Sequence, residues 1–585
     1  MREFLLVCRA ADDLPSQALS EDLAKKASAQ GLVVSALNPR AWLAAPSSSP
    51  ATPIRVGGWT LIGDVFDRRS PVIPYAHPDD PWGYERKLMA RFWGRYVGVL
   101  FGAGDQLSAL LRDPSGALEC VAWSEKGLTI VASTAFEWLI KALRPPWRIN
   151  SARLAQELHA VVTGTGALLI DGPTALEPGT IQPLPLERQA LAVWTPADIA
   201  RRSLWTSPDP HSAMKAIRSS IDEAVSGFAS LPGALAAEVS GGLDSSIIAS
   251  SLVRQKPDGQ RLWINAYGST PESDERAHVA ILGQSLGFKP LSLPHVTGRM
   301  TPDWLAAMAG DFRPGLNGLD HPQDVAWARH VVDGGASALM TGKGGDSILF
   351  QAATTDVFTD LWKSRGWRAL GHPDLAELAA GNEISIWSMI RTAVRYSAAG
   401  QTPPRRAHPI LSPLTEPFVG HPWLQDLDAF GPSKAFHIAG VADSVSHHGP
   451  SVLSRAVDVR HPLCSQPVVE ACLALPTALL TAGGRDRGLA RQAFRDGLPD
   501  TIVNRRSKGE MTRIYGRLIV DNLDILRPWL IDGRLAALGL IDRATAETEL
   551  TPEALIWRGQ HSVILGIAAL EGWTRLWEDR LGRPA

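Results

Sequence analysis

The chain has 585 residues, and its 58 Lys and Arg residues nearly balance its 60 Asp and Glu residues, which leaves a formal net charge of −2. This balance provides no general basic field and excludes a protein that binds nucleic acid through its overall charge, so a phosphate-bearing ligand has to be held by local groups. The length exceeds the usual span of one hydrophobic core and predicts two domains.

The cysteines and the apolar segments exclude other classes of protein. Cys8, Cys120, Cys464 and Cys472 form no CxxC pair, so they fit neither a disulfide framework nor a zinc site and favour a reducing cytoplasm. The apolar run before Cys8 is too short for a signal peptide and predicts a first β strand. No stretch approaches the roughly 18 apolar residues that a membrane helix needs. We therefore expect a soluble, cytoplasmic protein with no membrane partner.

The first 205 residues contain short apolar segments separated by Gly, Pro and Asp, a pattern typical of β strands. Strands are expected at residues 4–7, 59–62, 96–101, 118–123 and 128–132. Together they predict a β-rich sandwich. Prolines 183, 185 and 196 and the Ser-Pro-Asp-Pro segment at 207–210 predict a linker, so we place a domain boundary near residue 205.

The second part of the chain, residues 206–585, has a different periodicity. One face of an expected helix is apolar at Met214, Ile217, Ile221, Val225 and Phe228. Residues 234–239 predict a strand, residues 247–254 a helix and residues 262–267 a second strand. This order is a βαβ unit and indicates a parallel sheet with helices on its faces. From about residue 355 onward the patterns are mostly helical.

The strongest motif lies between the first of these strands and the helix. It consists of Ser240, Gly241, Gly242, Leu243, Asp244, Ser245 and Ser246. Glycines allow the backbone to approach an anion, serines add hydroxyl donors, and a helix start presents unpaired N–H groups, so the motif suits the pyrophosphate of a nucleotide. It lacks the Gly-Lys-Ser/Thr ending of a Walker A loop. Asp244 would repel a phosphate unless a cation lay between them, so we assign it to Mg²⁺.

This motif resembles the SGGxDSS signature of the PP-loop ATP pyrophosphatase domain in the asparagine synthetase superfamily, and the resemblance extends over most of the chain. Residues 341–346 (TGKGGD) are similar to the family's second glycine loop. This implies that Gly344 and Gly345 contact the nucleotide and that Asp346 shares the Mg²⁺ with Asp244. The segment Ser273-Asp274-Glu275 resembles the family's acidic segment near the nucleotide. The cofactors implied are ATP and Mg²⁺.

A third segment, residues 498–509, resembles the family segment that ends in an essential Lys-Gly pair. The resemblance implies a catalytic role for Lys508 alongside Asp244 and Asp346. A lysine is a mobile point charge that can follow the negative charge that develops when an acyl-adenylate forms and when an amine attacks it. Arg505 and Arg506 either contact phosphate or cover a surface.

The N-terminal part is similar to a class II glutaminase domain that has lost its active site. Residues 112–116 (RDPSG) resemble an RDPxG stretch, and residues 62–64 (IGD) replace the NGE of the glutamine pocket. Glutamine hydrolysis in that family needs an N-terminal cysteine. Position 2 is Arg2, and Cys8 falls inside an expected strand. We expect this domain to be inactive as a glutaminase and to serve as a structural or docking module.

The resemblance implies an α/β fold class. Residues 1–205 are expected to form a degenerate class II glutaminase (Ntn-like) β-rich sandwich domain. Residues 206–585 are expected to form a PP-loop α/β synthetase domain with a parallel sheet and many helices. The absence of an ammonia supply favours relatives whose substrate already carries an amine.

Three stretches are similar to the C-terminal half of lasso-peptide macrolactam cyclases: residues 460–463 with 466–470, residues 483–487 with 490–491, and residues 504–509. The implied substrate is a precursor peptide whose N-terminal amine is joined to an Asp or Glu side chain. The implied partners are a leader peptidase and a leader-recognition protein. The alternatives are a small-molecule amide or β-lactam synthetase and an ammonia-dependent asparagine synthetase-like enzyme.

Lys343 in the second glycine loop leaves the general base open, because a protonated lysine cannot take a proton from the attacking amine. The sequence allows three explanations. Burial near Mg²⁺ lowers the pKa of Lys343, another group is the base, or the amine arrives neutral.

Overall fold

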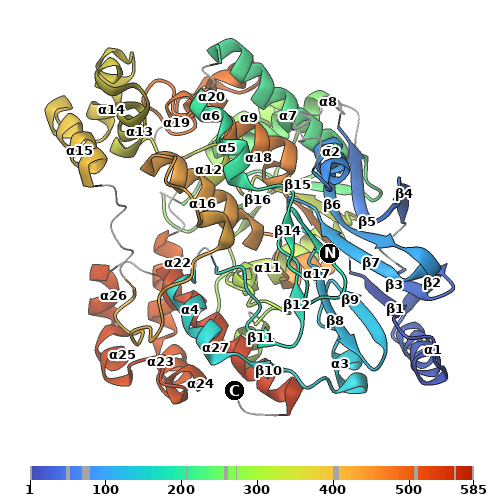
Figure 1. Ribbon diagram of the computed structural model, residues 1–585. Helices are drawn as coiled ribbons and strands as arrows, with labels where there is room; N and C mark the ends of the chain where they lie inside the picture. The colour runs from blue at the N-terminus through green and yellow to red at the C-terminus, as the bar shows by residue number, and fades with distance from the viewer. Residues whose placement is uncertain are drawn as a thin grey trace.

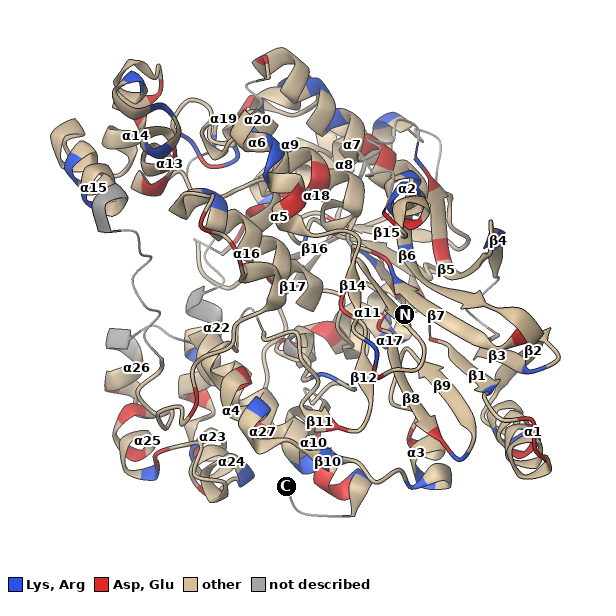
Figure 2. Ribbon diagram, in the orientation of Figure 1, with Lys and Arg blue, Asp and Glu red and all other residues tan. Residues whose placement is uncertain are grey.

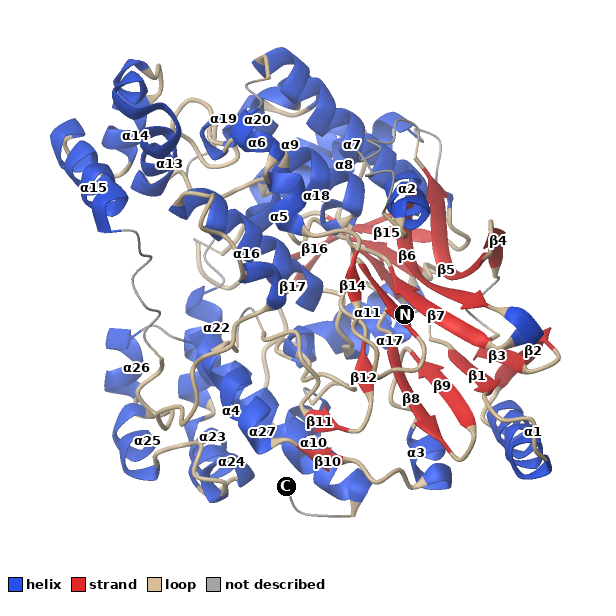
Figure 3. Cartoon of the chain, viewed as in Figure 1, coloured by secondary structure: helices blue, strands red, loops and turns tan. Residues whose placement is uncertain are grey.

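The structure is a computed structural model that describes residues 3–47, 53–68, 80–161, 164–205, 208–255, 261–271, 273–307, 309–399, 407–505, 512–558 and 561–582. A β sandwich occupies one side of the molecule, and a parallel sheet surrounded by helices forms the rest (Figures 1 and 3). This arrangement confirms the predicted fold class.

The sandwich consists of two six-stranded antiparallel sheets. The first sheet contains, in spatial order, β12 (Thr174–Ala175), β8 (Val121–Glu125), β9 (Leu128–Ala132), β1 (Leu5–Arg9), β3 (Ala41–Pro46) and β2 (Leu32–Asn38). The second sheet contains β14 (Leu191–Ala192), β13 (Thr180–Pro183), β7 (Leu107–Arg112), β6 (Phe92–Phe101), β5 (Trp59–Asp67) and β4 (Ile54–Val56). A separate pair joins β10 (Arg148–Ile149) and β11 (Ile170–Asp171).

Alternation of side chains along the strands explains how the two sheets pack. Leu6 and Cys8 of the first sheet share a buried cluster with Ile62 of the second sheet, so these residues fill the space between the sheets. The intervening residues Leu5 and Val7 face the opposite side of the first sheet and belong to another buried cluster. Both faces of β1 are therefore apolar and covered.

Helices cover the outer faces of the sandwich. The N-terminal helices are α1 (Leu14–Ala29), α2 (Gly83–Arg91), α3 (Glu137–Leu143), α4 (Ser151–His159), α5 (Pro196–Ala200) and α6 (Arg202–Trp205). The last helix of the chain, α27 (His561–Leu581), shares a buried cluster with the first sheet, and α7 (Pro210–Ser230) shares one with the second sheet. The hydrophobic cores thus continue across residue 205, and the division there stays a prediction.

The predicted linker is not irregular along its whole length. β13 ends at Pro183, and Pro196 is the first residue of α5, whose N-cap Thr195 accepts a hydrogen bond from the backbone N–H of Asp198 at 3.1 Å. Proline is favoured at the first helical position because that N–H needs no helical partner. The segment before residue 205 is therefore partly strand and partly helix.

The second region contains a five-stranded parallel sheet. Its spatial order is β17 (Leu291–Pro294), β16 (Leu262–Tyr267), β15 (Leu235–Glu238), β18 (Ala338–Met340) and β19 (Asp458–Arg460). The chain runs outward from β15 in one direction and then resumes at β18 on the other side. Ligands of open parallel sheets bind at such a switch point, outside the carboxyl ends of the strands.

Helices surround this sheet and continue to the end of the chain. The helices up to residue 399 are α8 (Leu243–Gln255), α9 (Arg276–Leu286), α10 (Pro302–Ala307), α11 (His321–Asp333), α12 (Gly345–Ile348), α13 (Thr355–Arg365), α14 (Leu375–Gly381) and α15 (Ile386–Ala399). Those from residue 432 are α16 (Pro432–Ser446), α17 (Val452–Ala456), α18 (Gln466–Leu473), α19 (Thr477–Leu480), α20 (Gly488–Ala493), α21 (Asp500–Val503), α22 (Thr512–Asp521), α23 (Leu523–Ile531), α24 (Arg534–Ala537), α25 (Arg543–Glu549) and α26 (Pro552–Arg558). The predicted βαβ unit and the helical C-terminal region are confirmed.

Basic and acidic residues are interspersed over the helices, while the strands carry few of them (Figure 2). Among the described residues, no helix combines the length and the apolar character needed to span a bilayer. The four cysteines are all buried and free, as their spacing predicts.

Candidate active site

The first glycine-containing turn joins the carboxyl end of β15 to the start of α8. Within it the Ser240 N–H donates to Ser245 Oγ at 3.0 Å, and the Ser246 hydroxyl donates to the Gly242 carbonyl at 2.7 Å. Gly241 has a φ of +71°, a left-handed conformation that favours glycine. The turn is therefore closed by hydrogen bonds between its own residues.

The helix after this turn begins earlier than the sequence predicts. We expected α8 from residue 247, but it starts at Leu243, so the second half of the motif forms the first helical turn. The unpaired N–H groups and the positive end of the helix dipole consequently belong to motif residues. This placement suits a phosphate group better than a separate loop would.

The second glycine loop joins β18 to α12 and lies directly against the first turn. A Cβ on Gly342 would stand 2.6 Å from the Ser245 backbone nitrogen, and a Cβ on Gly345 would stand 2.6 Å from Asp244 Cβ. Gly344 has a φ of +85°. Only glycine therefore fits at these three positions, and the two motifs converge as the sequence predicts.

A cavity of about 760 Å³ opens where the two turns meet, at the switch point of the parallel sheet. Of the predicted nucleotide-binding residues, those that line it are Ser240, Gly242, Asp244, Ser245, Gly344, Gly345 and Asp346. Gly241, Leu243 and Ser246 belong to the same turn but are not part of the cavity wall. The hydroxyl of Ser246 holds the turn closed, so its role is structural in this arrangement.

Arg487 holds the two predicted metal ligands together. Its Nη1 donates to Asp244 Oδ2 at 2.7 Å and to Asp346 Oδ1 at 2.5 Å. The Arg487 side chain is buried, and its backbone has a φ of +55°, which is unusual for a residue other than glycine. Strained backbone of this kind often occurs at functional sites. Sequence reasoning noticed Arg487 only as part of the 483–491 stretch.

The carboxylates fit the coordination habits of Mg²⁺. This ion is usually bound by one or two carboxylates, with substrate phosphates and water as the other ligands. Asp244 and Asp346 reach the same guanidinium nitrogen, so they already converge on one point of positive charge. In the described part of the chain, no group of three or more His, Cys, Asp and Glu side chains is arranged to hold a metal ion. A Mg²⁺ site made of these two carboxylates and the substrate phosphates agrees with the close approach of Asp244 and Asp346 and with the lack of a third protein ligand among the described residues.

Arg505 connects the first turn to the acidic segment after β16. Its Nη1 donates to the Gly241 carbonyl at 3.1 Å, and its Nη2 pairs with Glu275 Oε1 at 2.6 Å. Ser273 of the same segment lines the cavity. Asp274 instead pairs with Arg276 at the surface, and the hydrogen bond from Arg276 lowers the pKa of Asp274 to about 2. Of the acidic segment, Ser273 and Glu275 are therefore near the nucleotide site.

Lys508 and Gly509 lie outside the described residues, so the catalytic role of Lys508 stays a prediction. Arg506 lies there as well. The last described residue before them is Arg505, whose guanidinium contacts the first turn.

Lys343 extends into the cavity beside several buried histidines. Its Nζ donates to Asn317 Oδ1 at 3.1 Å. The Lys343 side chain is exposed, which disagrees with the explanation that burial near Mg²⁺ makes it the general base. Burial lowers the pKa of His447 to about 4, and Lys343 adds to that effect. His461 is buried with its Nδ1 2.7 Å from Thr341 Oγ1. Burial lowers the pKa of His461 as well, so both imidazoles are neutral at pH 7.

The N-terminal domain has no exposed thiol among its described residues. Cys8 is 2% exposed in the centre of the sandwich, and burial raises the pKa of its thiol far above the ordinary value. Asp64, at the position of the expected glutamine pocket, pairs with Arg95 Nε at 2.9 Å, and Arg95 Nη1 also contacts Asp458 of β19 at 3.0 Å. This position therefore holds the two regions of the chain together.

Residues 112–116 also have a structural role. The Arg112 guanidinium is buried and donates to the carbonyls of Gly116, Leu118 and Leu176. Asp113 accepts from the backbone N–H of Tyr96 at 3.0 Å, and burial raises the pKa of Asp113 to about 6. The turn is therefore fixed by its own charged residues.

Comparison with known families agrees with this geometry. A family model described as asparagine synthase matches residues 216–575, more than half of the chain. The matched segment runs from α7 into α27 and includes both glycine turns and Arg487. The search of curated proteins finds no match.

Proposed function

The chain belongs to the asparagine synthase family, which makes it an ATP-dependent amide-bond-forming synthetase, and from this premise we propose that it closes a macrolactam ring in a peptide. The reaction joins the N-terminal amine of a core peptide to an Asp or Glu side chain of the same peptide. The products are the cyclic peptide, AMP and pyrophosphate. The observation that carries the proposal is the convergence of both glycine turns on one large cavity at the switch point.

Residues of the two turns have defined tasks in the first step. The N–H groups at the start of α8 and the Ser240 and Ser245 hydroxyls bind the phosphates of ATP. Asp244 and Asp346 hold Mg²⁺, which supplies positive charge against the phosphates when bound. The substrate carboxylate attacks the α-phosphorus, the bond to the β-phosphate breaks, and pyrophosphate leaves with its electron pair.

In the second step the substrate amine attacks the acyl carbon of the adenylate. A carbon–nitrogen bond forms, AMP leaves, and the amine gives up one proton. Lys508 is assigned to the negative charge that develops on the acyl oxygen. Lys343, on the second glycine loop, lines the same cavity.

Two features support an amine that arrives on the substrate itself. Cys8 is buried between the sheets, and Asp64, at the position of the expected glutamine pocket, is engaged by Arg95. Neither side chain is available to a glutamine substrate in this arrangement. An amine attached to the same molecule as the carboxylate needs no separate ammonia source, and its reaction benefits from proximity.

The size of the cavity leaves room for more than the nucleotide. Sites for small ligands typically measure roughly 300–1,000 Å³, and a cavity of about 760 Å³ has room for a nucleotide together with an acyl group. The rest of a peptide would have to lie outside this cavity. Trp367 and Trp387 are 74% and 77% exposed, Trp362 is half-buried against Trp367, and none of the three lines the cavity.

Mass spectrometry of a core peptide with the enzyme, ATP and Mg²⁺ tests the proposal, with the leader peptidase added where the amine has to be exposed. We expect the loss of one water and a protease-resistant threaded product. Free peptide rarely adopts a conformation in which its tail passes through the future ring. Peptide incubated with ATP but without enzyme should therefore give no threaded product. Unchanged peptide together with efficient conversion of a free β-amino acid or aspartate would replace this proposal with a small-molecule synthetase.

A further inference from the structure

A second, smaller cavity of about 160 Å³ lies beside the catalytic cavity, between the sandwich and the helices of the second region. Ala117, Ser446, His448 and Gly449 line both cavities, so the two spaces share one wall. We call the smaller space the side pocket. It therefore lies next to the place where the substrate reacts.

Acidic side chains outnumber basic ones in the side pocket. Glu119, Glu157, Glu177 and Asp311 line it, against Arg112 and Arg313. His421 adds no charge at pH 7, because burial lowers its pKa to about 4. The described lining therefore carries an excess of carboxylates.

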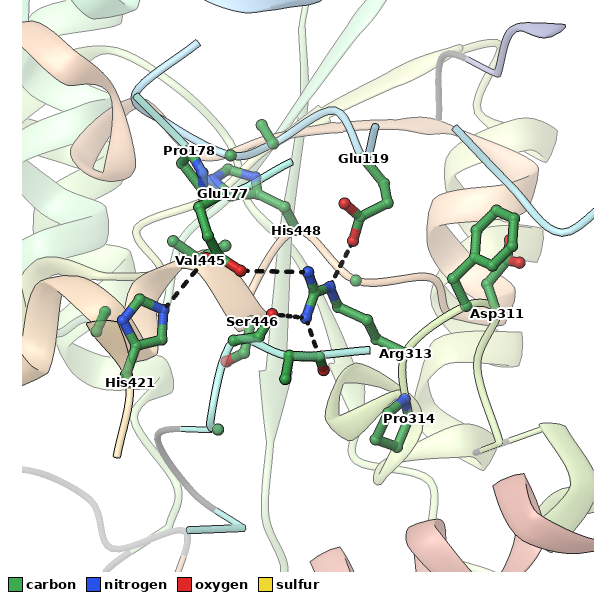
Figure 4. Close-up of a pocket in the computed structure, with 18 of the residues that line it drawn as sticks. Glu119, Glu177, Pro178, Asp311, Arg313, Pro314, His421, Val445, Ser446 and His448 are labelled. Carbon is green, nitrogen blue, oxygen red and sulfur yellow. Dashed lines mark hydrogen bonds and ion pairs between the residues drawn. The ribbon is translucent and has the colours of Figure 1, made fainter. Parts of the chain in front are cut away.

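The two arginines are largely engaged by one glutamate. Glu119 lies 2.7 Å from Arg112 Nη1. It also lies 2.7 Å from Arg313 Nε, and Figure 4 marks this second pair. Burial alone would raise the pKa of Glu119, but the two guanidinium groups lower it to about 2. Glu119 is thus a satisfied anion, and its ion pairs leave little positive charge for the other carboxylates.

Glu177 is the carboxylate that these cations do not satisfy. Its nearest guanidinium nitrogen is Arg313 Nη2 at 3.9 Å, and Nε2 of the neutral His421 imidazole lies at the same distance. No hydrogen bond among the described residues ends on its carboxylate (Figure 4). Burial raises the pKa of Glu177, as expected for an under-compensated acid. The exposed quarter of its side chain faces the side pocket.

Part of the remaining wall is apolar. Val161, Phe312 and Leu570 line the side pocket and are buried. A carboxylate at one end of a small apolar space matches an aliphatic stem that ends in an ammonium group, because the stem contacts the apolar wall and the charge meets the carboxylate. A carboxylate or phosphate would instead meet an excess of like charge.

We propose that the side pocket binds a primary ammonium group on a short aliphatic stem of the substrate, with Glu177 as its counter-ion. This inference rests on the proposed function for its purpose, which is to select and orient the peptide before ring closure. The ammonium belongs either to a lysine-like side chain or to the N-terminal residue. Both sources present the same chemistry to Glu177.

Calorimetric titration of the full chain with n-butylammonium chloride, in the absence of ATP and Mg²⁺, tests the inference. We expect saturable binding that n-butanol, a neutral isostere, does not reproduce. Alaninamide in a parallel titration distinguishes the sources: tighter binding of n-butylammonium supports a side chain, and tighter binding of alaninamide supports an N-terminus. Because no nucleotide is present, failure here leaves the synthetase proposal standing, and failure of peptide cyclisation leaves this binding measurable.

Two matched variants localise the site. Glu177→Gln should weaken n-butylammonium binding by at least about tenfold, the loss of one charge-assisted contact. Glu157→Gln is the control in the same pocket, because Glu157 already accepts from the N–H and the hydroxyl of Thr165 at 2.8 and 2.7 Å. Equal weakening by both variants, equal binding of n-butanol by the unmodified chain, or no saturable binding would overturn the inference.

Discussion

Gly345 lies so close to Asp244 that a Cβ added to the glycine would stand 2.6 Å from the Asp244 Cβ. Gly345→Ala therefore has to displace the carboxylate that we assign to Mg²⁺. A displacement of about 1 Å at a reacting site can cost on the order of 10²-fold in rate, so we expect pyrophosphate release to fall by that factor. Initial rates of pyrophosphate release at saturating ATP measure the effect.

Gly371→Ala is the control for this variant, because a Cβ on Gly371 meets no atom within 4 Å. It should retain its rate and its melting temperature. If Gly345→Ala and Gly371→Ala behaved alike, the contact between the two glycine turns would have no part in the reaction.

Arg487→Met removes the positive charge between Asp244 and Asp346. Breaking a buried ion pair by removal of one partner typically costs about 3–5 kcal/mol of unfolding free energy. We expect a clear fall in the melting temperature without Mg²⁺ and partial recovery with Mg²⁺ and ATP, because the ion replaces the lost charge.

Arg91→Met provides the comparison, since the Arg91 pair with Asp67 is exposed on both sides, at 58% and 54%. Exposed pairs contribute little to stability. Equal losses in the two variants, or no recovery of Arg487→Met with Mg²⁺ and ATP, would argue against a shared cation position.

Asp346→Asn tests the metal assignment with little effect on folding, because the Asp346 side chain is 51% exposed. Loss of one charge at the metal should raise the Mg²⁺ concentration for half-maximal activity by on the order of tenfold. A Mg²⁺ titration of pyrophosphate release, with the surface variant Asp67→Asn as control, measures this shift. An unchanged Mg²⁺ requirement would remove Asp346 from the metal site.

Lys508→Met keeps most of the aliphatic stem and removes the charge. If Lys508 acts on charge that develops in the transition state, kcat should fall by on the order of 10²-fold while the affinity for ATP stays nearly constant. Lys141→Met, at a side chain that is 67% exposed, should change neither value. An equally large loss of ATP affinity would indicate that Lys508 binds phosphate in the ground state.

Local patterns allowed the sequence to predict the βαβ unit. β16 has the predicted bounds, residues 262–267, because an apolar run between turn residues is a complete local signal. The start of α8 was predicted late because Ser and Asp near residue 244 resemble loop residues, although they are equally suited to a first helical turn. For the same reason Pro196 was interpreted as a linker residue, although it is the first residue of α5.

The contacts that assemble the site were beyond local patterns. Asp244 and Arg487 are 243 residues apart, and neither a charge pattern nor a helix period connects them. The bridge from Asp64 through Arg95 to Asp458 likewise joins three separate strands. The family resemblance predicted that Asp244 and Asp346 of the two glycine turns lie close together. It did not predict the arginine between these carboxylates.

The nucleotide product of a single reaction tests the central claim most directly. Enzyme, core peptide, Mg²⁺ and ATP are incubated, and AMP, ADP, phosphate and pyrophosphate are separated and quantified together with the cyclic peptide. We predict one AMP and one pyrophosphate for each amide bond, because the turn between β15 and α8 is built to bind a departing pyrophosphate. Formation of ADP and phosphate in step with the amide bond would contradict adenylation and with it the assignment of this site.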